Sequence, residues 1–410
     1  MNKKLLKDFA ELAVKVGVNL QKGQVLVVDS AIECKEFARM VIEEGYKAGA
    51  SRVIIRWSDA FANKCFYQYS SDEELQNIPD YVVAQAHYIV DNKAANVIIS
   101  SPDPEAMKGI DPKKLQISAI ASNKKMEFYR TFRMKSETQW CIVAYPNEVW
   151  AHKVFPDLPL DEAQDKLLAA ILSASRVTEE KNAVEAWIEH MDTLKAHNDL
   201  LNQYHFKTLK FKNDLGTDLT IDLVDDHLWC GGGEDALNGV YFAPNIPTEE
   251  TFTMPHKDKV NGKVVATKPL NYQGQMIEDF YLVFKDGAVV EYGAKQGEES
   301  LKSLIELDEG SKRLGEVALI SHDSPISNMN ILFYNTLFDE NASCHLALGN
   351  AYTMNIVNGN FMSAEELASK GFNKSMTHVD FMFGSADMEI TGICADGSEV
   401  AIFKKGNFVI

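Results

Sequence analysis

The residues with the most chemical potential lie in the second half of the chain, among small and apolar neighbours. The segment FDENASCHLALGNAY, residues 338–352, contains an acid, an imidazole and a phenol at Glu340, His345 and Tyr352. A charged group in an apolar environment is costly unless it has a partner. A metal centre would provide one partner for carboxylates and imidazoles together, which predicts a metal-dependent hydrolase.

A second pair of candidate ligands follows this segment at His378 and Asp380. In a strand, side chains two positions apart project from the same face, so both could reach one metal ion or two adjacent ions. Val379, Phe381 and Phe383 would then face a core on the other side. The alternative for this pair taken alone is a surface strand with a polar face.

Two acids upstream complete the set of candidates. Glu316 opens an apolar run, residues 314–320, so it is either a solvated strand end or a ligand. A carboxylate can be shared by the two ions of a two-metal site, which would suit Glu316. Glu250 follows Glu249 directly, and in an extended segment only one of these two side chains can enter a given pocket. Taken alone, Glu250 would be interpreted as a solvated charge.

The local structure around His345 is left open by the sequence. If residues 345–352 are helical, His345 and Tyr352 are seven positions apart and share a face. If HLALG forms a strand instead, that relation fails. A lone histidine is also more often a satisfied core residue than a ligand, so the metal hypothesis depends on the number of acids and imidazoles together.

Other motifs favour different chemistry only weakly. Cys344 could be a nucleophile beside His345, but no further part of a thiol triad is visible, and small buried cysteines are common. The glycines of residues 231–233 could cradle a phosphate, but no Lys-Ser/Thr follows them, so a tight turn that lets a substrate backbone approach is favoured. The H-E-x-x-H and G-x-S-x-G motifs are absent, which excludes a zincin and leaves a serine hydrolase of the α/β type unsupported.

The elements of the first half alternate between short apolar runs and helical patterns. A buried type of strand followed by a helix, repeated several times, predicts a mostly parallel sheet covered by helices. No G-x-G-x-x-G follows the first strand, so a dinucleotide site is not supported. We expect strands at residues 24–30, 52–57, 96–100 and 140–146, and helices at 34–48, 73–89 and 112–127.

The second half has a different pattern. A helical region over residues 160–204 has a break near Ser175, and strand-like runs dominate after Thr208. We therefore expect an N-terminal α/β domain at residues 1–185 and a largely antiparallel α+β domain at 186–410 that carries the candidate site. Asn or Asp followed by Gly between strand-like flanks predicts hairpin turns, at Asn261-Gly262, Asp286-Gly287 and Asp396-Gly397.

Composition limits the classes of partner. The chain of 410 residues has a net charge of −18, which argues against nucleic acid, because phosphate binding needs clustered Lys and Arg. The acidity could reflect solubility alone, or an acidic cavity that attracts cations, metals or free amino termini. Six cysteines without C-x-x-C spacing predict reduced thiols in the cytoplasm. We expect no membrane span, since there is no run of about 18 apolar residues.

The amino-terminal segment is predicted to be an amphipathic helix. Leu5, Phe9 and Leu12 fall at helical spacing. Asp8 and Glu11 interrupt the apolar run, so we do not expect a signal peptide.

Three strings give the chain a family resemblance. NIPTEETFTMPHKDKVNGKV (245–264), FDENASCHLALGNAY (338–352) and THVDFMFG (377–384) resemble the metallo-aminopeptidases typified by aminopeptidase T, aminopeptidase S and PepS. The resemblance runs over nearly the whole chain. It implies a two-domain cytoplasmic exopeptidase of broad specificity that forms homodimers, with the first domain helping to enclose a cavity.

The resemblance also implies roles for particular residues. Tyr352 is similar to the family's active-site tyrosine, and Glu316 to a ligand shared by two divalent ions. Carboxylate and imidazole ligands without thiolate suit Zn, Co or Mn and permit Mg. The implied ligands are Glu250, Glu316, Glu340, His345, His378 and Asp380.

A mechanism follows as a hypothesis. Two metal ions would activate a water molecule, Tyr352 could donate a hydrogen bond to the developing oxyanion, and an acid such as Glu250 could bind the free amino group. Glu316 is a candidate general base only if bridging does not occupy it fully. The alternatives are another two-metal amidohydrolase, such as a dipeptidase or an aminoacylase, and an acidic protein that binds peptides or cations without turnover.

Overall fold

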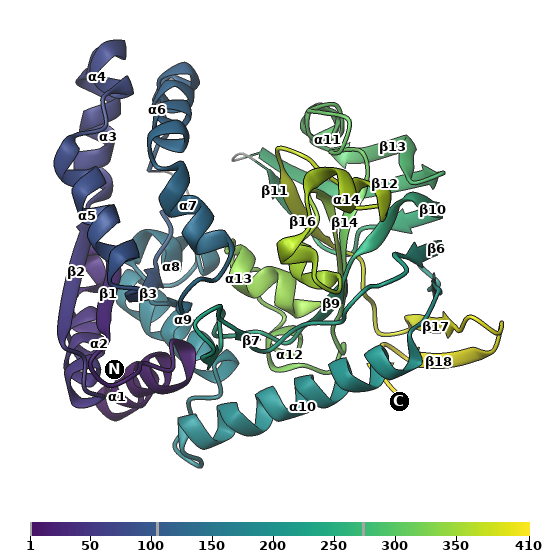
Figure 1. Ribbon diagram of the computed structural model, residues 1–410, viewed down its shortest axis with the longest axis horizontal. Coiled ribbons are helices and arrows are strands. Elements are labelled where there is room, and N and C mark those ends of the chain that lie inside the picture. Colours follow the sequence, from purple (N-terminus) through teal and green to yellow (C-terminus); the bar gives the residue numbers. More distant parts are fainter. Residues whose placement is uncertain (1, 104–105, 273–274) are drawn as a thin grey trace. The chain divides into compact units, whose positions relative to one another are not determined.

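The chain folds as two compact units in a computed structural model that describes residues 2–103, 106–272 and 275–410 (Figure 1). Unit 1 contains the chain up to His190 together with Gly233–Pro247. Unit 2 contains Met191–Gly232 and Thr248–Ile410. Within the described residues, no helix has the length and apolar character needed to cross a membrane.

A four-stranded parallel sheet forms the centre of unit 1, as the alternating pattern predicts. The strand order is β2-β1-β3-β4, and every neighbouring pair is parallel. In a parallel sheet, helices connect the strands and cover both faces. The strands are therefore buried on both sides, which explains why their sequences are continuous apolar runs. The strands are β1 Val25–Ala31, β2 Arg52–Ser58, β3 Ala95–Ser100 and β4 Trp140–Ala144.

The predicted helices of unit 1 are present, but two of them are divided, and the helices at Ala60–Tyr69 and Glu148–Val154 were not predicted. The helix expected at 73–89 is two helices, because Pro79 is extended and the residue before a proline disfavours the helical conformation. The helix expected at 112–127 ends at Lys125, and another begins at Glu127. The helices are α1 Lys3–Leu12, α2 Lys35–Lys47, α3 Ala60–Tyr69, α4 Asp72–Gln76, α5 Asp80–Asp91, α6 Pro112–Lys125, α7 Glu127–Met134, α8 Glu148–Val154 and α9 Leu160–Ala174.

The helical region before the β-rich part is also divided. α9 ends at Ala174 with Ser175 as its C-cap, so the break near Ser175 is confirmed. α10 then runs from Ala183 to Tyr204 as a single long helix (Figure 1). A short two-stranded ribbon, β7 Glu234–Asp235 with β8 Tyr241–Phe242, also belongs to unit 1.

Unit 2 contains a nine-stranded sheet in which every pairing is antiparallel. Its order is β11-β12-β10-β6-β5-β17-β18-β19, and β13 pairs with β12. Apolar and polar residues alternate along most of these strands, as in a sheet with one buried face. The strands are β5 Thr208–Lys212, β6 Asp218–Leu223, β10 Pro255–Val265, β11 Leu270–Tyr272, β12 Gln275–Lys285, β13 Ala288–Gln296, β17 Glu389–Ile393, β18 Glu399–Lys404 and β19 Asn407–Phe408.

A second sheet of unit 2 has four antiparallel strands in the order β16-β15-β14-β9. These are β9 Thr251–Thr253, β14 Leu314–Leu319, β15 His345–Gly349 and β16 His378–Met382. The largely antiparallel α+β character predicted for this part of the chain is confirmed. Short helices connect the strands: α11 Glu298–Ile305, α12 Pro325–Met329, α13 Thr336–Asp339 and α14 Ala364–Ser369.

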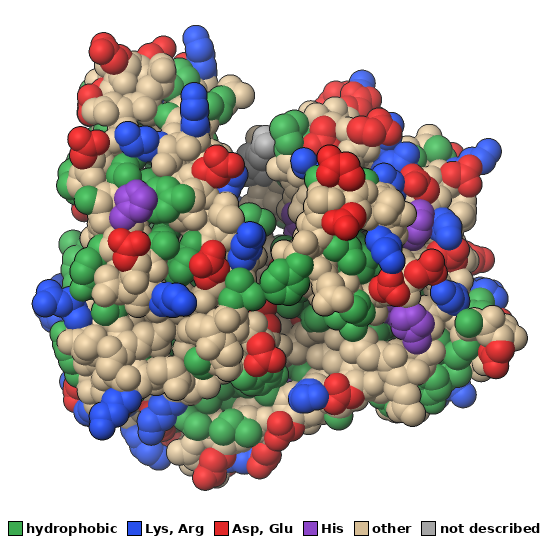
Figure 2. Space-filling model, in the orientation of Figure 1, with side chains coloured by type: hydrophobic (Ala, Val, Ile, Leu, Met, Phe, Trp, Pro, Cys, Tyr) green, Lys and Arg blue, Asp and Glu red, His purple; other side chains and the backbone are tan. Residues whose placement is uncertain are grey.

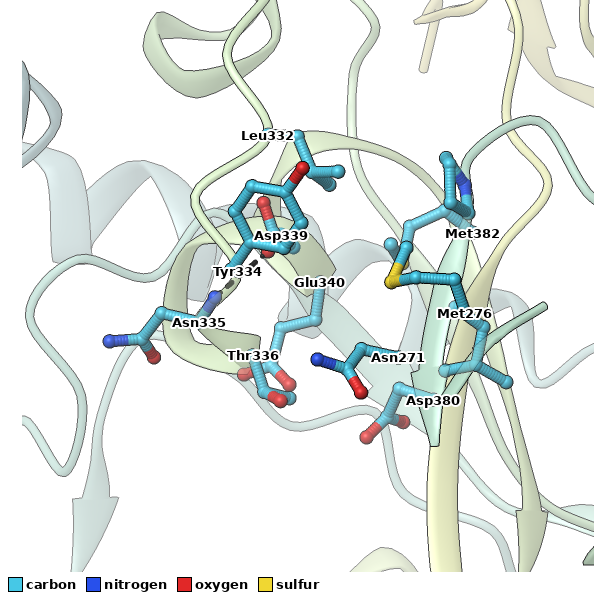
Figure 3. A pocket seen from close by; sticks show the side chains of 12 residues that line it. Asn271, Met276, Leu332, Tyr334, Asn335, Thr336, Asp339, Glu340, Asp380 and Met382 are labelled. Carbon is cyan, nitrogen blue, oxygen red and sulfur yellow. Dashed lines mark hydrogen bonds between the residues drawn. The ribbon is translucent and has the colours of Figure 1, made fainter. Parts of the chain in front are cut away.

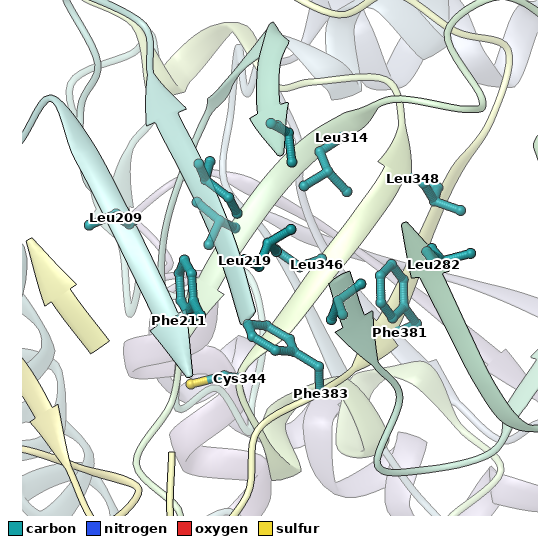
Figure 4. Close-up of a cluster of buried hydrophobic side chains, with 14 of the residues drawn as sticks. Leu209, Phe211, Leu219, Leu282, Leu314, Cys344, Leu346, Leu348, Phe381 and Phe383 are labelled. Carbon is teal, nitrogen blue, oxygen red and sulfur yellow. The ribbon is translucent and has the colours of Figure 1, made fainter. Parts of the chain in front are cut away.

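The main core of unit 2 lies where side chains of the two sheets meet. Figure 4 shows Leu209, Phe211 and Leu219 from the larger sheet and Leu346 and Phe381 from the smaller one within a single cluster of buried side chains. All five are 1% exposed or less. Burial of such side chains contributes about 1.5–3 kcal/mol each, so this core fixes one face of the four-stranded sheet.

Two of the three predicted hairpin turns are confirmed. Asp286-Gly287 joins β12 to β13, and Asp396-Gly397 lies between β17 and β18. Gly287 and Gly397 have φ values of 80° and 83°, which glycine adopts readily.

The hairpin predicted at Asn261-Gly262 is wrong, because β10 continues through both residues. Gly262 instead allows a close approach between strands, since a Cβ there would lie 2.2 Å from the carbonyl oxygen of Asp218. The side chain of Asn261 accepts a hydrogen bond from the backbone N–H of Asp286 at 2.9 Å. The dipeptide therefore stabilises a neighbouring turn and does not form one itself.

Candidate metal centre

Most of the candidate ligands come from adjacent strands of the four-stranded sheet. Glu316 lies on β14, His345 on β15, and His378 and Asp380 on β16. Glu250 is the residue directly before β9. Three strands of this sheet therefore carry candidate ligands, and the fourth strand, β9, directly follows one.

The strand register aligns the ligands in rows across the sheet. Glu316 pairs with Ala347, which in turn pairs with Asp380. His345 pairs with Ala318, and His378 with Gly349. Residues that are paired across strands share a face. The small side chains beside the longer ones leave room for the carboxylates and imidazoles to converge.

A β-bulge places Glu316 on this face. Leu314 pairs with Leu348, but Glu316 pairs with Ala347, so the register shifts between them. Leu314 and Leu348 are core residues, and regular alternation would place Glu316 on the core side with them. A Cβ on the intervening Gly315 would lie 2.4 Å from the carbonyl oxygen of Gly349. Glycine at this position permits the bulge that turns Glu316 away from the core.

The side chains form two groups of three potential ligands that share one residue. Glu250, Glu316 and His345 form one group, and Glu316, His378 and Asp380 form the other. Within each group, one ligand atom per residue lies within 4.8 Å of the others. Glu316 belongs to both.

The shared carboxylate has one oxygen directed to each imidazole. Oε1 of Glu316 lies 3.2 Å from Nε2 of His345, and Oε2 lies 3.6 Å from Nε2 of His378. Nε2 of His345 is also 3.4 Å from Glu250, and Nε2 of His378 is 3.4 Å from Asp380. The structure thus brings together five of the six predicted ligand side chains.

Both imidazoles are oriented by a backbone carbonyl. Nδ1 of His345 lies 2.9 Å from the carbonyl oxygen of Glu340, and Nδ1 of His378 lies 2.7 Å from that of Asn350. A carbonyl oxygen can only accept, so Nδ1 carries the proton in each ring. This leaves Nε2 directed toward the carboxylates, which is the arrangement that fixes the tautomer of metal-binding histidines.

The nearby carboxylates favour the protonated, positively charged form of both imidazoles. Burial alone would lower the pKa of His345, but the hydrogen bond with Glu316 and the nearby negative charges raise it to about 10. The pKa of His378 is likewise raised to about 9, against the effect of burial, mainly by Asp380. A divalent cation between Nε2 and the carboxylates would supply the same positive charge without those protons.

The pKa values of the carboxyl groups are shifted as well. Burial raises the pKa of Glu250 to about 7, and burial together with Asp380 and Glu250 raises that of Glu340. Burial would also raise the pKa of Asp380, but the nearby positive charge of His378 lowers it overall. Oδ1 of Asp380 is nevertheless buried without a well-formed hydrogen bond. An orphaned carboxylate oxygen among imidazoles fits a site built for a cation.

The structure places Glu340 beside the two groups and outside both. It begins a 3₁₀ turn, Glu340–Ala342, just before β15. Its carbonyl orients His345, and its side chain lines a cavity together with Asp380 (Figure 3).

Tyr352 reaches the site from a turn. HLALG forms β15, so the helical alternative for residues 345–352 is wrong. The Tyr352 ring lies 4.7 Å from the ring of His378, centroid to centroid, and 6.2 Å from that of Phe252. Burial, with the charges of Glu316 and Asp380, raises the pKa of the phenol. Its hydroxyl is therefore protonated, and a donor, at neutral pH.

Cys344 belongs to the core. It is 2% exposed, lies among the core side chains in Figure 4, and its thiol lies 3.3 Å from the carbonyl oxygen of Ile320. Burial raises its pKa to about 12, so the thiol is poorly suited to act as a nucleophile. This contradicts the alternative of a thiol enzyme.

The glycine run does allow a close approach, but to the protein's own backbone. Gly231 has a φ of 148°, and a Cβ there would lie 2.1 Å from the carbonyl oxygen of Glu250. Nδ2 of Asn198 donates to the carbonyl of Gly231 at 3.0 Å. Gly231 therefore helps to hold the segment that carries Glu250, a role that sequence patterns did not reveal.

The acidity of the chain is not confined to this site. Figure 2 shows acidic and basic side chains intermixed over the visible surface. The net charge therefore does not identify the site, whereas the buried carboxylates and imidazoles do.

Comparison with known proteins agrees with this chemistry. The family described as thermophilic metalloprotease (M29) matches residues 2–408. The chain belongs to the M29 metalloprotease family. M29 proteins are metalloproteases, so this chain is a metal-dependent hydrolase of peptide bonds, and the resemblance stated from the sequence is confirmed.

Curated relatives span almost the whole M29 chain. The protein is 45% identical over 403 residues to aminopeptidase AmpS of Bacillus subtilis, with 98% of each chain covered. It is 44% identical to aminopeptidase 2 of Geobacillus stearothermophilus, covering 99% of this chain and 98% of that one. It is 38% identical to aminopeptidase T of Thermus aquaticus, again with 99% and 98% covered.

Solved structures support the fold assignment. Wild-type AmpT from Thermus thermophilus superposes over 100% of both chains with a TM-score of 0.92 at 36% identity. A 2,5-dihydroxypyridine dioxygenase from Pseudomonas putida covers 100% of this chain and 98% of its own, with a TM-score of 0.55 at 13% identity. The second likeness concerns the fold alone. The predicted combination of a parallel α/β region and antiparallel sheets is confirmed.

Proposed function

We propose that the protein is a two-metal aminopeptidase that removes the first residue from peptides with a free amino terminus. The observation that carries this proposal is Glu316, whose two oxygens face two different imidazoles in two overlapping ligand groups. Aminopeptidases among the relatives support the exopeptidase activity.

The proposed ligands divide around the shared acid. Glu250 and His345 would hold one ion with Glu316, and His378 and Asp380 would hold the other with the same residue. Glu340 is retained as a further ligand, because its carboxylate lines the cavity that Asp380 also lines. Oxygen and imidazole ligands suit Zn, Co or Mn and permit Mg.

The bound ions would supply an activated water and polarise the scissile carbonyl. The protein's own groups would do the rest. The protonated phenol of Tyr352 would donate a hydrogen bond to the oxygen on which negative charge develops. Glu316 would bridge the two groups, and it would accept a proton only with an oxygen not engaged as a ligand.

The selectivity for a free amino terminus follows from the same charges. A substrate ammonium forms a favourable ion pair with a carboxylate that keeps one oxygen free of the metal ions. Glu250 is the proposed partner of that ammonium, through a carboxylate oxygen that it does not use as a metal ligand. An acetylated amino terminus carries no charge and would lose this interaction.

The test compares Leu-p-nitroanilide with its N-acetylated form. We expect rapid chelator-sensitive hydrolysis of the free substrate and none of the blocked one. Preferential hydrolysis of the blocked form would indicate an aminoacylase, and turnover of dipeptides alone would indicate a dipeptidase. Binding without chelator-sensitive hydrolysis would leave only a peptide- or cation-binding protein.

Metal analysis after dialysis tests the number of ions. We expect close to two divalent ions per chain, and a stoichiometry of one would contradict the shared role of Glu316. Adding back each ion to metal-stripped protein, with a panel of amino-acid p-nitroanilides, would then rank the metals by activity.

We further propose a cytoplasmic homodimer whose C-terminal domain, residues 186–410, carries catalysis. All six cysteines are free, which fits a reducing compartment. Phe61, Tyr69 and Tyr81 of unit 1 are 76%, 77% and 75% exposed, and exposed aromatic side chains are typical of interfaces. Light scattering coupled to size exclusion would test the dimer.

A further inference from the structure

A cavity of about 130 Å³ lies directly beside two acids of the centre. Glu340 and Asp380 line it, and Figure 3 shows both side chains ending near Asn271. Met276 and Met382 line it as well, on the side of Asp380 in the same view. One part of the cavity is therefore acidic and another is apolar, as in pockets that orient a small organic group.

The position of Met382 is set by the same strand that carries two ligands. His378, Asp380 and Met382 alternate along β16, so they project from one face of the sheet. Met382 pairs across the strands with His345 and is 5% exposed. It is thus the next side chain after the ligands along this face.

The apolar side is completed from other parts of unit 2. Met276 comes from β12, Leu270 from β11, and Leu332 from the segment before α13. Thioether side chains are unbranched and flexible, and they adapt to apolar groups of different shape.

The order of atoms in a peptide links this cavity to the proposed reaction. The side chain of the first residue is attached to the carbon that carries the free amino group. If that amino group is held among the carboxylates, the first side chain is attached only one carbon away, and Glu340 and Asp380 belong both to those carboxylates and to the cavity wall.

We propose that this cavity is the subsite for the side chain of the N-terminal residue, and that it selects leucine and methionine. The inference rests on the proposed aminopeptidase function and names its substrate class. It disfavours tryptophan by size and aspartate and glutamate by charge.

Size sets the upper limit. An apolar cavity of roughly 150 Å³ admits a ligand as large as benzene. A cavity of about 130 Å³ therefore encloses an isobutyl or thioether chain, is filled by a phenyl ring, and leaves part of an indole outside.

Charge sets the second limit. Asp339, Glu340 and Asp380 all line the cavity, and a substrate carboxylate would be repelled there. Asp339 also has a structural task, since its carboxylate accepts hydrogen bonds from the backbone N–H groups of Phe333 and Asn335 at 2.7 and 3.0 Å. These bonds hold the segment that carries the wall residue Tyr334.

The experiment measures kcat/KM for p-nitroanilides of leucine, methionine, phenylalanine, tryptophan and glutamate. The wild type should prefer leucine and methionine. Met382→Ala should lower kcat/KM for the leucine substrate about 10-fold, because removing apolar contacts from a pocket costs this much or more. It should raise the value for the tryptophan substrate, so the Trp/Leu ratio should increase at least about 10-fold.

A control variant and a second variant of the cavity wall complete the test. Met376→Ala is the matched control, since Met376 is 79% exposed and should leave the Trp/Leu ratio unchanged. Met276→Ala changes the same wall from another strand, and it should shift the ratio in the same direction. Melting temperature and metal content would show whether either wall variant has lost its fold or its ions.

Binding of free amino acids gives a measurement that does not require turnover. Calorimetry should show L-leucine binding more tightly than L-tryptophan to the wild type, with the difference reduced in both wall variants. An unchanged Trp/Leu ratio in both wall variants, or equal binding of the two amino acids to the wild type, would overturn the subsite.

The two proposals fail in different ways. If the wild type hydrolyses no p-nitroanilide, the aminopeptidase function is wrong, and the calorimetry still decides whether the cavity prefers leucine. If hydrolysis is strong but the preference does not respond to Met276 or Met382, only the subsite is wrong.

Discussion

The two faces of the four-stranded sheet of unit 2 use the same strands for opposite purposes. One row across β14, β15 and β16 is Val317, Leu346 and Phe381, and it belongs to the core. The adjacent row is Glu316, Ala347 and Asp380, and it belongs to the candidate metal centre. A shift of one residue separates a packed apolar face from a cluster of acids.

The two faces are stabilised by different forces. On the core face, large side chains fill the space and many contacts determine their positions. On the site face, small residues alternate with long charged ones, and the positions depend on register, on the bulge at Gly315 and on backbone carbonyls. The core face should therefore govern stability, while the site face should govern metal binding and catalysis.

Glu316→Gln should have the largest effect, because it removes the ligand that both groups share. We expect metal content to fall from about two ions toward zero, and activity to fall by about 10³-fold or more, since the ions supply several kcal/mol of transition-state stabilisation. Atomic absorption and kcat/KM would measure both. Glu299→Gln, an exposed acid on α11, is the matched control and should retain both ions.

Phe381→Ala tests the opposite face of the same strand. Phe381 is 1% exposed and packs against Phe280 at 5.6 Å between ring centroids. Its truncation should lower the free energy of unfolding by about 3–5 kcal/mol, because a cavity remains in the core. Denaturant titration would measure this. If metal stoichiometry in the folded protein also dropped to zero, the two faces would not be independent.

Tyr352→Phe should slow catalysis while leaving the fold and the metal centre intact. Losing one donor to a developing oxyanion costs about 3 kcal/mol, or roughly 100-fold in kcat. Turnover, metal content and melting temperature should be measured on the same preparation. Unchanged turnover would remove Tyr352 from the mechanism.

A buried imidazole without carboxylate partners gives the smallest predicted effect. His227 is 2% exposed, its Nδ1 bonds the carbonyl of Val224, and its Nε2 has no partner. Burial lowers its pKa to about 4, the opposite of the shift in His345. Between pH 6.5 and pH 4, His227 is therefore neutral in the folded protein, whereas in the unfolded chain, where its pKa is about 6.5, it is protonated.

The contribution of neutral His227 to the free energy of unfolding is present above pH 6.5 and is lost as the pH falls toward 4. Wild-type protein should lose about 2 kcal/mol of unfolding free energy from this residue between pH 7 and pH 4.5. His227→Asn should show a correspondingly shallower acid dependence in urea titrations. An equal slope in both proteins would contradict the lowered pKa.

The sequence by itself determined the elements and the ligand types. Apolar runs and helical spacing are local properties, so the strands of unit 1 and most of its helices could be predicted, whereas α3 and α8 were missed. The same holds for the hairpins at Asp286-Gly287 and Asp396-Gly397. The prediction at Asn261-Gly262 was wrong because these residues make contacts with distant parts of the chain. Asn261 accepts a hydrogen bond from Asp286, and Gly262 allows a close approach to Asp218. Such non-local pairing cannot be predicted from a dipeptide.

Tertiary structure decided how the ligands converge. Glu250 and Asp380 are distant in the chain, and their meeting depends on strand register, which is a non-local property. The bulge at Gly315 reverses the face that simple alternation assigns to Glu316.

The groups that orient the two imidazoles could not be found from sequence patterns at all. They are the backbone carbonyls of Glu340 and Asn350, and a carbonyl is present at every residue whatever its side chain. The sequence names the side chains that can bind a metal, but only the folded backbone selects the atoms that aim them, because hydrogen bonds to the main chain depend on position and not on residue type.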